Sequence, residues 1–219
     1  KDAAPWGAPH VFSNDKLFLT YIHVAGRKVY AGQSEALVEY DLGDADVPWF
    51  AIEPRQIKLL AAFGEPPIGV SFPDPVNWGR RVQFKWNDER RLSLVVSNGH
   101  YDASCTDMFA SFITSRNDLE PITDDWREQI EGRFSAYKTR GETDLLHITN
   151  GKIEGGIAGS KITLETDTHC DGEAWMQRQL FLRAIKIADR IKFSEVEQHQ
   201  RMFFEGPNVR GIVTTGRKP

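Results

Sequence analysis

The order of the predicted elements constrains the fold of this chain more than any single motif. A unit of one strand, one helix and three strands begins at Val47, and the same order begins again at Met108 and at Trp175. Alternating or β-branched runs indicate the strands, and Gly, Asn, Asp and Pro clusters separate them. Recurrence at a spacing of roughly 60 residues is typical of a structural repeat. The sequence therefore predicts an α+β fold made of repeated strand-helix-three-strand units.

Three helices are predicted from capping signals and helical spacing. The segment 55–63 follows Pro54 and ends at a Gly, and Thr123 precedes two acids at the start of a helix to about Lys138. The third helix is expected at 179–190. Strands are expected at 16–24, 27–30, 36–41, 47–52, 68–72, 81–86, 91–96, 145–149, 152–157, 161–166, 191–196, 201–205 and 209–214, with Asn150-Gly151 as a hairpin turn.

Two domains are expected, at 1–97 and 108–219, joined by a connector at 98–107. The hairpin from His23 and the hairpin from His147 carry His, Lys and Gly at equal offsets, which supports two copies of one design. Residues 1–15 are rich in Ala, Pro and Gly and supply neither a strand nor a helix. The first strand and helix of domain 1 are therefore expected to be missing, through a truncated start, or degenerate.

Composition favours a soluble globular protein. The chain has 219 residues, 40% of them apolar, with 27 Lys and Arg against 31 Asp and Glu for a net charge of −4. The longest apolar stretches are far below the roughly 18 residues of a membrane helix. Two cysteines are too few for a secreted disulfide framework, so a cytoplasmic protein is expected.

Positive charge gathers in the predicted helices. The segments 55–63, 126–140 and 178–192 hold eleven Lys and Arg against three acids, a net charge of +8, which leaves −12 for the rest. In the third helix Phe181, Ala184, Ile185 and Ala188 form one apolar stripe, with Arg183, Lys186 and Arg190 opposite. Such a face is either an ordinary solvated surface or a surface that meets a polyanion.

The chain resembles the DNA sliding clamps, the ring-shaped processivity factors of DNA polymerases. The residues that carry the resemblance are Val47–Ile52 leading into Gln56–Leu60, Leu180–Ile185 leading to Ile191–Phe193, and the closing strand Val209–Val213. The resemblance covers roughly residues 16–214 and rests on pattern and order. It implies two clamp domains, similar to the proliferating-cell-nuclear-antigen type or a phage or bacterial relative, with basic helices on one side of the sheets.

The resemblance also implies a function without catalysis. A homotrimeric ring would encircle duplex DNA and hold a DNA polymerase and a clamp loader through short hydrophobic peptides, with no cofactor, no metal and no membrane partner. It would act in the cytoplasm of a bacterial or phage-infected cell, or in a eukaryotic nucleus. The implied DNA-binding residues are Arg55, Lys58, Arg127, Arg133, Lys138, Arg183, Lys186 and Arg190. The implied peptide-binding residues are Leu37, Met108, Phe109, Phe112, Ile212 and Val213, although Phe109 and Phe112 would equally suit a core strand.

Two other classes of function stay open. One is an open, β-rich binding module that does not close into a ring. The other is an enzyme, for which the possible groups are the cluster from His100 to Cys105 and the metal-capable turn from Asp167 to Asp171. Neither group carries a family signature, and no phosphate-binding glycine motif is present. His23 and His147 are expected to pack on sheets rather than bind a ligand.

Overall fold

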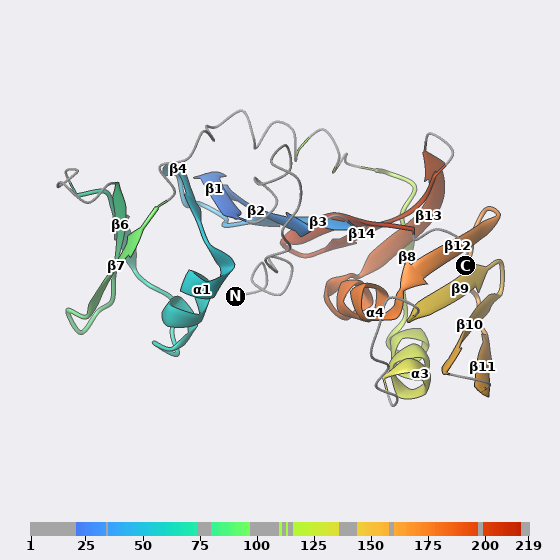
Figure 1. The fold of residues 1–219 in the computed structure, drawn as a ribbon. Coiled ribbons are helices and arrows are strands. Elements are labelled where there is room, and N and C mark those ends of the chain that lie inside the picture. The colour runs from blue at the N-terminus through green and yellow to red at the C-terminus, as the bar shows by residue number, and fades with distance from the viewer. Residues whose placement is uncertain are drawn as a thin grey trace. The chain divides into compact units, whose positions relative to one another are not determined.

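The computed structural model describes residues 21–33, 35–73, 80–96, 110, 113, 116–135, 144–157, 160–196 and 199–215 (Figure 1). Contacts within the chain define two compact units, an N-terminal unit, Lys1–Phe112, and a C-terminal unit, Ile113–Pro219. Each unit has its own buried side chains and is described by itself.

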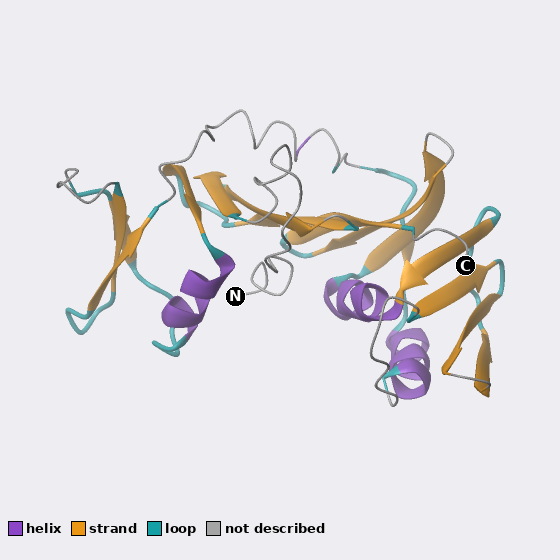
Figure 2. Cartoon of the chain, viewed as in Figure 1, coloured by secondary structure: helices purple, strands orange, loops and turns teal. Residues whose placement is uncertain are grey.

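Among its described elements, the N-terminal unit has two antiparallel sheets and one helix, which Figure 2 colours by type. The first sheet has the order β4-β1-β2-β3 and the second has the order β5-β6-β7. The elements are β1 (Ile22–Gly26), β2 (Lys28–Gln33), β3 (Ala36–Asp41), β4 (Val47–Ile52), α1 (Pro54–Ala61), β5 (Gly69–Ser71), β6 (Arg81–Lys85) and β7 (Arg91–Val95). Phe50 lies edge-on to Phe84, at 6.4 Å between ring centroids, and Phe63 stacks on Trp86 at 4.0 Å. These aromatic contacts join the two sheets and the end of α1.

Among its described elements, the C-terminal unit has two antiparallel sets of four strands, of order β11-β10-β9-β12 and β8-β13-β14-β15, and two helices. The elements are β8 (Glu120–Pro121), α3 (Asp124–Phe134), β9 (Leu145–Thr149), β10 (Lys152–Ile157), β11 (Ser160–Glu165), β12 (Glu173–Gln177), α4 (Arg178–Ile187), β13 (Arg190–Val196), β14 (His199–Gly206) and β15 (Val209–Thr214). Both helices bury one stripe, and the Trp126 ring of α3 lies edge-on to Phe181 of α4.

The two halves of the C-terminal unit exchange their first strands. β8 begins the first half but pairs with β13 of the second, with Ile191 opposite Glu120. β12 begins the second half but pairs with β9 of the first, with Ala174 opposite Ile148. In the N-terminal unit β4 pairs with β1 in the same way. The predicted repeat of strand, helix and three strands is confirmed, and residues 1–20 lie outside the described part.

Two arginines tie α3 to α4 at opposite ends of the helix pair. Arg178 is only 4% exposed. It donates from Nε and Nη2 to the two carboxylate oxygens of Asp144, both at 2.7 Å, and from Nη1 to the Phe134 carbonyl at 2.7 Å. Arg127 donates to the carbonyls of Ile185 at 2.9 Å and Ala188 at 2.8 Å. Each guanidinium therefore meets the carbonyl end of the other helix, where the helix dipole favours a cation, and the helices run antiparallel.

Two predicted boundaries are wrong. α4 ends at Ile187 rather than Arg190, because Asp189 N–H donates to Glu205 O at 2.8 Å and Arg190 enters the β13 ladder. The strand expected from Met108 is found later, as the two residues of β8, where it meets β13. The Asn150-Gly151 hairpin is confirmed, and Gly151 has the positive φ of +75° that favours glycine there.

Removing the Arg178 side chain should unfold the C-terminal unit more readily than any exposed change on the same helix. Arg178→Ala leaves the Asp144 carboxylate and the Phe134 carbonyl without their buried partner, and the expected loss in free energy of unfolding is about 3–5 kcal/mol. Denaturant titration followed by circular dichroism measures it, with Arg183→Ala as the exposed control. An equal loss in free energy of unfolding in the two variants would contradict the conclusion that Arg178 holds α3 and α4 together.

Candidate nucleic-acid interface

α4 presents a positive surface that the sequence predicts. Leu180, Phe181, Ala184 and Ile185 are buried against the sheets, which leaves Gln179, Arg183 and Lys186 exposed at positions i, i+4 and i+7 on one stripe. α4 contains no Asp or Glu. We call Gln179, Arg183 and Lys186 the α4 stripe. Its side chains suit contacts to phosphate groups, which Lys, Arg and Gln commonly make.

α1 carries two of the predicted cations but does not repeat the α4 stripe. Arg55 is 80% exposed and pairs with Glu53, and Lys58 is exposed one turn later. Counted from the two N-caps, Leu59 takes the place of Arg183, and Leu59 is 51% exposed. No residue of α1 is buried. The two cations of α1 therefore lie beside an exposed leucine, and one of them is paired with Glu53.

The prediction that α3 is a basic helix is wrong for the residues that the structure assigns to it. α3 begins at Asp124, so two first-turn acids join Glu128 and Glu131 against Arg127 and Arg133. The two acids satisfy the helix N-terminus, which favours negative charge, and Thr123 caps it by accepting from Trp126 N–H at 3.1 Å. Arg133 is exposed, and Lys138 lies outside the described residues.

Arg127 and Arg190 are directed at the protein itself. Arg127 binds the end of α4, as described, and also Asp124 at 2.6 Å. Arg190 begins β13 rather than extending the α4 stripe, and its Nη2 donates to the Leu119 carbonyl at 2.8 Å. The interpretation that Arg190 continues the row of Arg183 and Lys186 is therefore wrong, because that row requires three positions on one helix.

The predicted peptide-binding residues do not form an open pocket where they are described. Ile212 is 2% exposed and Val213 is fully buried in β15, so both are core residues. Leu37 is half-buried, and Met108, Phe109 and Phe112 lie outside the described residues. An aspartate at Val213 would bury a charge and report on folding rather than on peptide binding.

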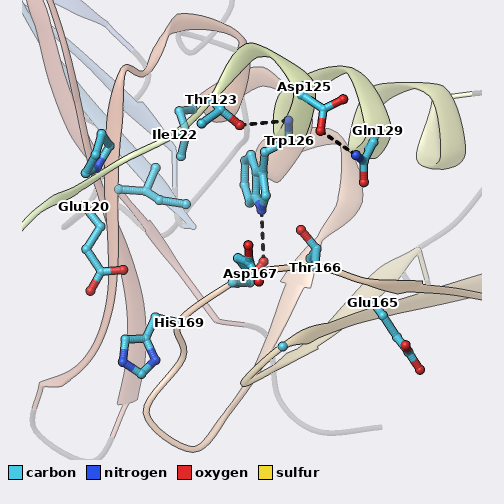
Figure 3. Close-up of a pocket in the computed structure, with 14 residues that line it drawn as sticks. Glu120, Ile122, Thr123, Asp125, Trp126, Gln129, Glu165, Thr166, Asp167 and His169 are labelled. Carbon is cyan, nitrogen blue, oxygen red and sulfur yellow. Dashed lines mark hydrogen bonds between the residues drawn. The ribbon is translucent and has the colours of Figure 1, made fainter.

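A polar cleft of about 580 Å³ lies in the C-terminal unit between the start of α3 and the segment after β11 (Figure 3). Four of its lining residues are acids, namely Glu120, Asp125, Glu165 and Asp167. Trp126 donates from Nε1 to Thr168 Oγ at 3.2 Å along its wall. The carboxylates repel a polyanion, so the cleft does not suit binding of DNA.

Only some residues of the predicted metal-capable turn, Asp167 to Asp171, line this cleft. Asp167 and His169 line it, whereas Cys170 is buried and its thiol pKa is raised to about 11 by desolvation. Across the described ranges no group of three or more His, Cys, Asp or Glu side chains is placed to hold a metal ion. His169 instead lies 3.0 Å from Asn150 Oδ1.

The β11-β10-β9-β12 sheet carries ion pairs on the face opposite its buried side chains. Glu154 on β10 lies near Lys152 and, at 2.8 Å, near Lys161, and these two cations lower its pKa to about 2. His147 on β9 stacks on Trp175 at 4.1 Å and contacts Glu173 at 2.9 Å. His147 thus packs on its sheet, and His23 is fully buried in β1 with its ring 6.3 Å from Trp49.

Comparison with solved structures places this architecture among known folds. The chain superposes on the DNA polymerase sliding clamp from Pseudomonas aeruginosa with a TM-score of 0.67 at 13% identity, over 99% of this chain and 62% of that one. The chain has the sliding-clamp fold. The DNA polymerase III beta chain of Streptococcus pneumoniae matches with a TM-score of 0.62 at 14% identity, over 99% and 62%. The DnaN sliding clamp of Bartonella birtlesii matches with a TM-score of 0.65 at 14% identity, over 99% and 63%.

The chain spans about 62% of the length of the clamps that it matches. No protein-family model matches the sequence, and no curated protein matches it either. Among the described residues, none of the helices is long and apolar enough to cross a membrane.

Neutralising the α4 stripe should weaken duplex DNA binding without unfolding the protein. Arg183→Gln with Lys186→Gln removes two exposed cations, so the slope of log affinity against log salt should become shallower by about 1.8. Fluorescence anisotropy with a labelled duplex at several salt concentrations measures it. An unchanged affinity and slope would identify the stripe as a solvated surface.

Arg127→Met should lower stability more than it lowers DNA affinity, the opposite of the α4 stripe variant. It removes charged hydrogen bonds to two carbonyls of the α4 end, so the free energy of unfolding should fall by about 2 kcal/mol or more, measured by denaturant titration. Duplex affinity, measured where the variant is fully folded, should change less than in the α4 stripe variant. A stable Arg127→Met protein with weakened DNA binding would place Arg127 on the DNA surface instead.

The lowered pKa of Glu154 predicts a loss of stability in acid. A carboxyl whose folded pKa is about 2 stabilises the protein above its ordinary pKa near 4.5, and this contribution disappears as the pH falls from there toward 2. Thermal unfolding across this range should therefore show a smaller acid-induced drop in Glu154→Gln than in the wild type. Glu165→Gln, an exposed change on β11, is the control, and identical drops in Glu154→Gln and the wild type would contradict the prediction.

Proposed function

We propose that this chain is a DNA sliding clamp, which encircles duplex DNA and tethers a DNA polymerase for processive synthesis without catalysing a reaction. The observation that carries the proposal is the α4 stripe, an acid-free row of exposed polar and positive side chains on a clamp fold whose total charge is negative. The neighbours are named DNA polymerase III beta subunits and sliding clamps, which supports the same role.

The charge distribution suits sliding rather than tight binding. Two exposed cations on α4 and two on α1 make few phosphate contacts, and contacts to phosphate carry no sequence information. A net charge of −4 disfavours binding of DNA over the whole surface of the chain. Weak, exchanging contacts of this kind allow a closed ring to move along the duplex while it stays linked to it.

Ring closure is proposed to occur by pairing of sheet edges between copies. Within the described residues β7 pairs only with β6, and β11 pairs only with β10, so each unit offers an edge strand with unpaired backbone groups. Head-to-tail pairing of one edge with the other gives a heterologous interface, which closes into a cyclic assembly. Two clamp units per chain and six units per ring give a homotrimer.

Polymerase and clamp loader are proposed to bind through short hydrophobic peptides. Ile212 and Val213 are core residues and drop out of this site. Leu37 and the predicted connector residues Met108, Phe109 and Phe112 remain the candidates. Such a protein acts where DNA is replicated, in the cytoplasm of a bacterial or phage-infected cell or in a nucleus.

A topological assay tests the proposal directly. Native mass spectrometry over a range of concentrations should show a trimer, and protein assembled on a circular duplex should stay bound in high salt until the circle is cut. A ring leaves only over an end, whereas an open binding module dissociates equally from circular and linear DNA. A monomer that shows no difference between the two DNA forms would overturn the clamp proposal in favour of the open module.

A further inference from the structure

One face of the β5-β6-β7 sheet carries a cluster of positive side chains that lies outside the helices. The face is formed by alternate residues of each strand: Arg81, Gln83 and Lys85 of β6, Arg91, Ser93 and Val95 of β7, and Gly69 and Ser71 of β5. The opposite face holds Val82, Phe84 and Leu94, which are buried. We call the first set the β6–β7 basic face.

The three strands contain no acidic residue, so the cations of this face have no carboxylate among their strand neighbours. Lys85 and Arg91 are moreover direct cross-strand partners, and like charges in that position repel each other. Within the described ranges, no ion pair forms at Arg81, Lys85 or Arg91, and the Arg81 Nε is buried without a hydrogen-bond acceptor.

The other sheet lysines of the described chain are neutralised by carboxylates, in three cases from a neighbouring strand. Lys28 on β2 lies 3.0 Å from Glu39 and 2.9 Å from Asp41 on β3. Lys161 on β11 lies 2.8 Å from Glu154, and Lys192 on β13 lies 3.1 Å from Glu120. The β6–β7 basic face departs from this arrangement, so an anion from outside the chain would relieve its repulsion.

The neutral side chains of the face identify the kind of anion. Ser71 and Ser93 present hydroxyls, and Gln83 donates from Nε2 to Ser93 Oγ at 3.2 Å, so uncharged hydrogen-bonding groups lie between the cations. Arg, Lys, Ser and Gln together are the side chains that contact nucleic-acid phosphates. Phe84 points to the buried side, so the described part of the face offers no aromatic ring on which a base could stack.

The face lies on the side of its sheet away from the end of α1. Phe63, directly after α1, stacks on Trp86, which follows the buried alternation of Val82 and Phe84. An extended single strand can follow the surface of a twisted sheet, whereas a duplex cylinder touches such a surface only along a narrow line. We propose that the β6–β7 basic face binds the phosphodiester backbone of single-stranded DNA, independently of the duplex surface on α4.

The test compares two double variants against two DNA forms. Lys85→Gln with Arg91→Gln should make the salt slope for an oligothymidine single strand shallower by about 1.4, since each single-strand phosphate contact contributes about 0.7. Between 50 and 200 mM salt this makes the fall in affinity about sevenfold smaller than in the wild type. The α4 stripe variant Arg183→Gln with Lys186→Gln should leave the single-strand slope unchanged.

A matched control and a stability measurement separate binding from folding. Lys161→Gln removes a paired sheet lysine of the other unit and should not change the single-strand slope. The melting temperature of the Lys85→Gln, Arg91→Gln protein should not fall, because the change removes a repulsive pair. Unchanged single-strand binding in that folded variant would overturn the proposal, as would stronger competition by a polyglutamate peptide than by the oligonucleotide. Loss of duplex binding alone would instead assign these residues to the duplex surface.

Discussion

The C-terminal unit depends on two guanidinium groups that hold a pair of antiparallel helices by their carbonyl ends. Arg178 is buried with Asp144 and the last carbonyl of α3, and Arg127 binds the last carbonyls of α4. A helix end leaves carbonyl groups without partners, and a buried end needs a donor from elsewhere. The planar guanidinium supplies several donors in fixed directions, which a lysine cannot match. The orientation of α4, and with it the exposure of Arg183 and Lys186, follows from these contacts.

The sequence predicts this fold well where the signal is local. The Asn150-Gly151 turn and the Thr123 cap depend on residues next to one another, and both are observed. The order of strand, helix and three strands emerges from alternation and helical spacing for the same reason. The sliding-clamp resemblance, built on that order, agrees with the fold of the solved clamps.

The errors arise where distant residues decide the outcome. Arg190 suits a helix by spacing, but pairing with Glu205 and Pro121 draws it into a sheet. β8 is two residues long, and only its partner β13 defines it as a strand. Arg127 and Arg183 are alike as charges in a helical pattern, yet one binds carbonyls from α4 and the other is exposed. The Lys85–Arg91 pair likewise becomes visible only when the register of β6 and β7 is known.

The exchange of first strands between the halves has a consequence for the order of folding. β8 contains Glu120, and its partner Ile191 is synthesised about seventy residues later. During synthesis the first half can form β9, β10, β11 and their hairpin, but β8 has no strand to pair with until β13 has left the ribosome. Contacts of such separation carry a large loop-closure cost and slow folding. The two halves therefore complete each other in one cooperative step, and neither half can be removed while the other retains its native sheets.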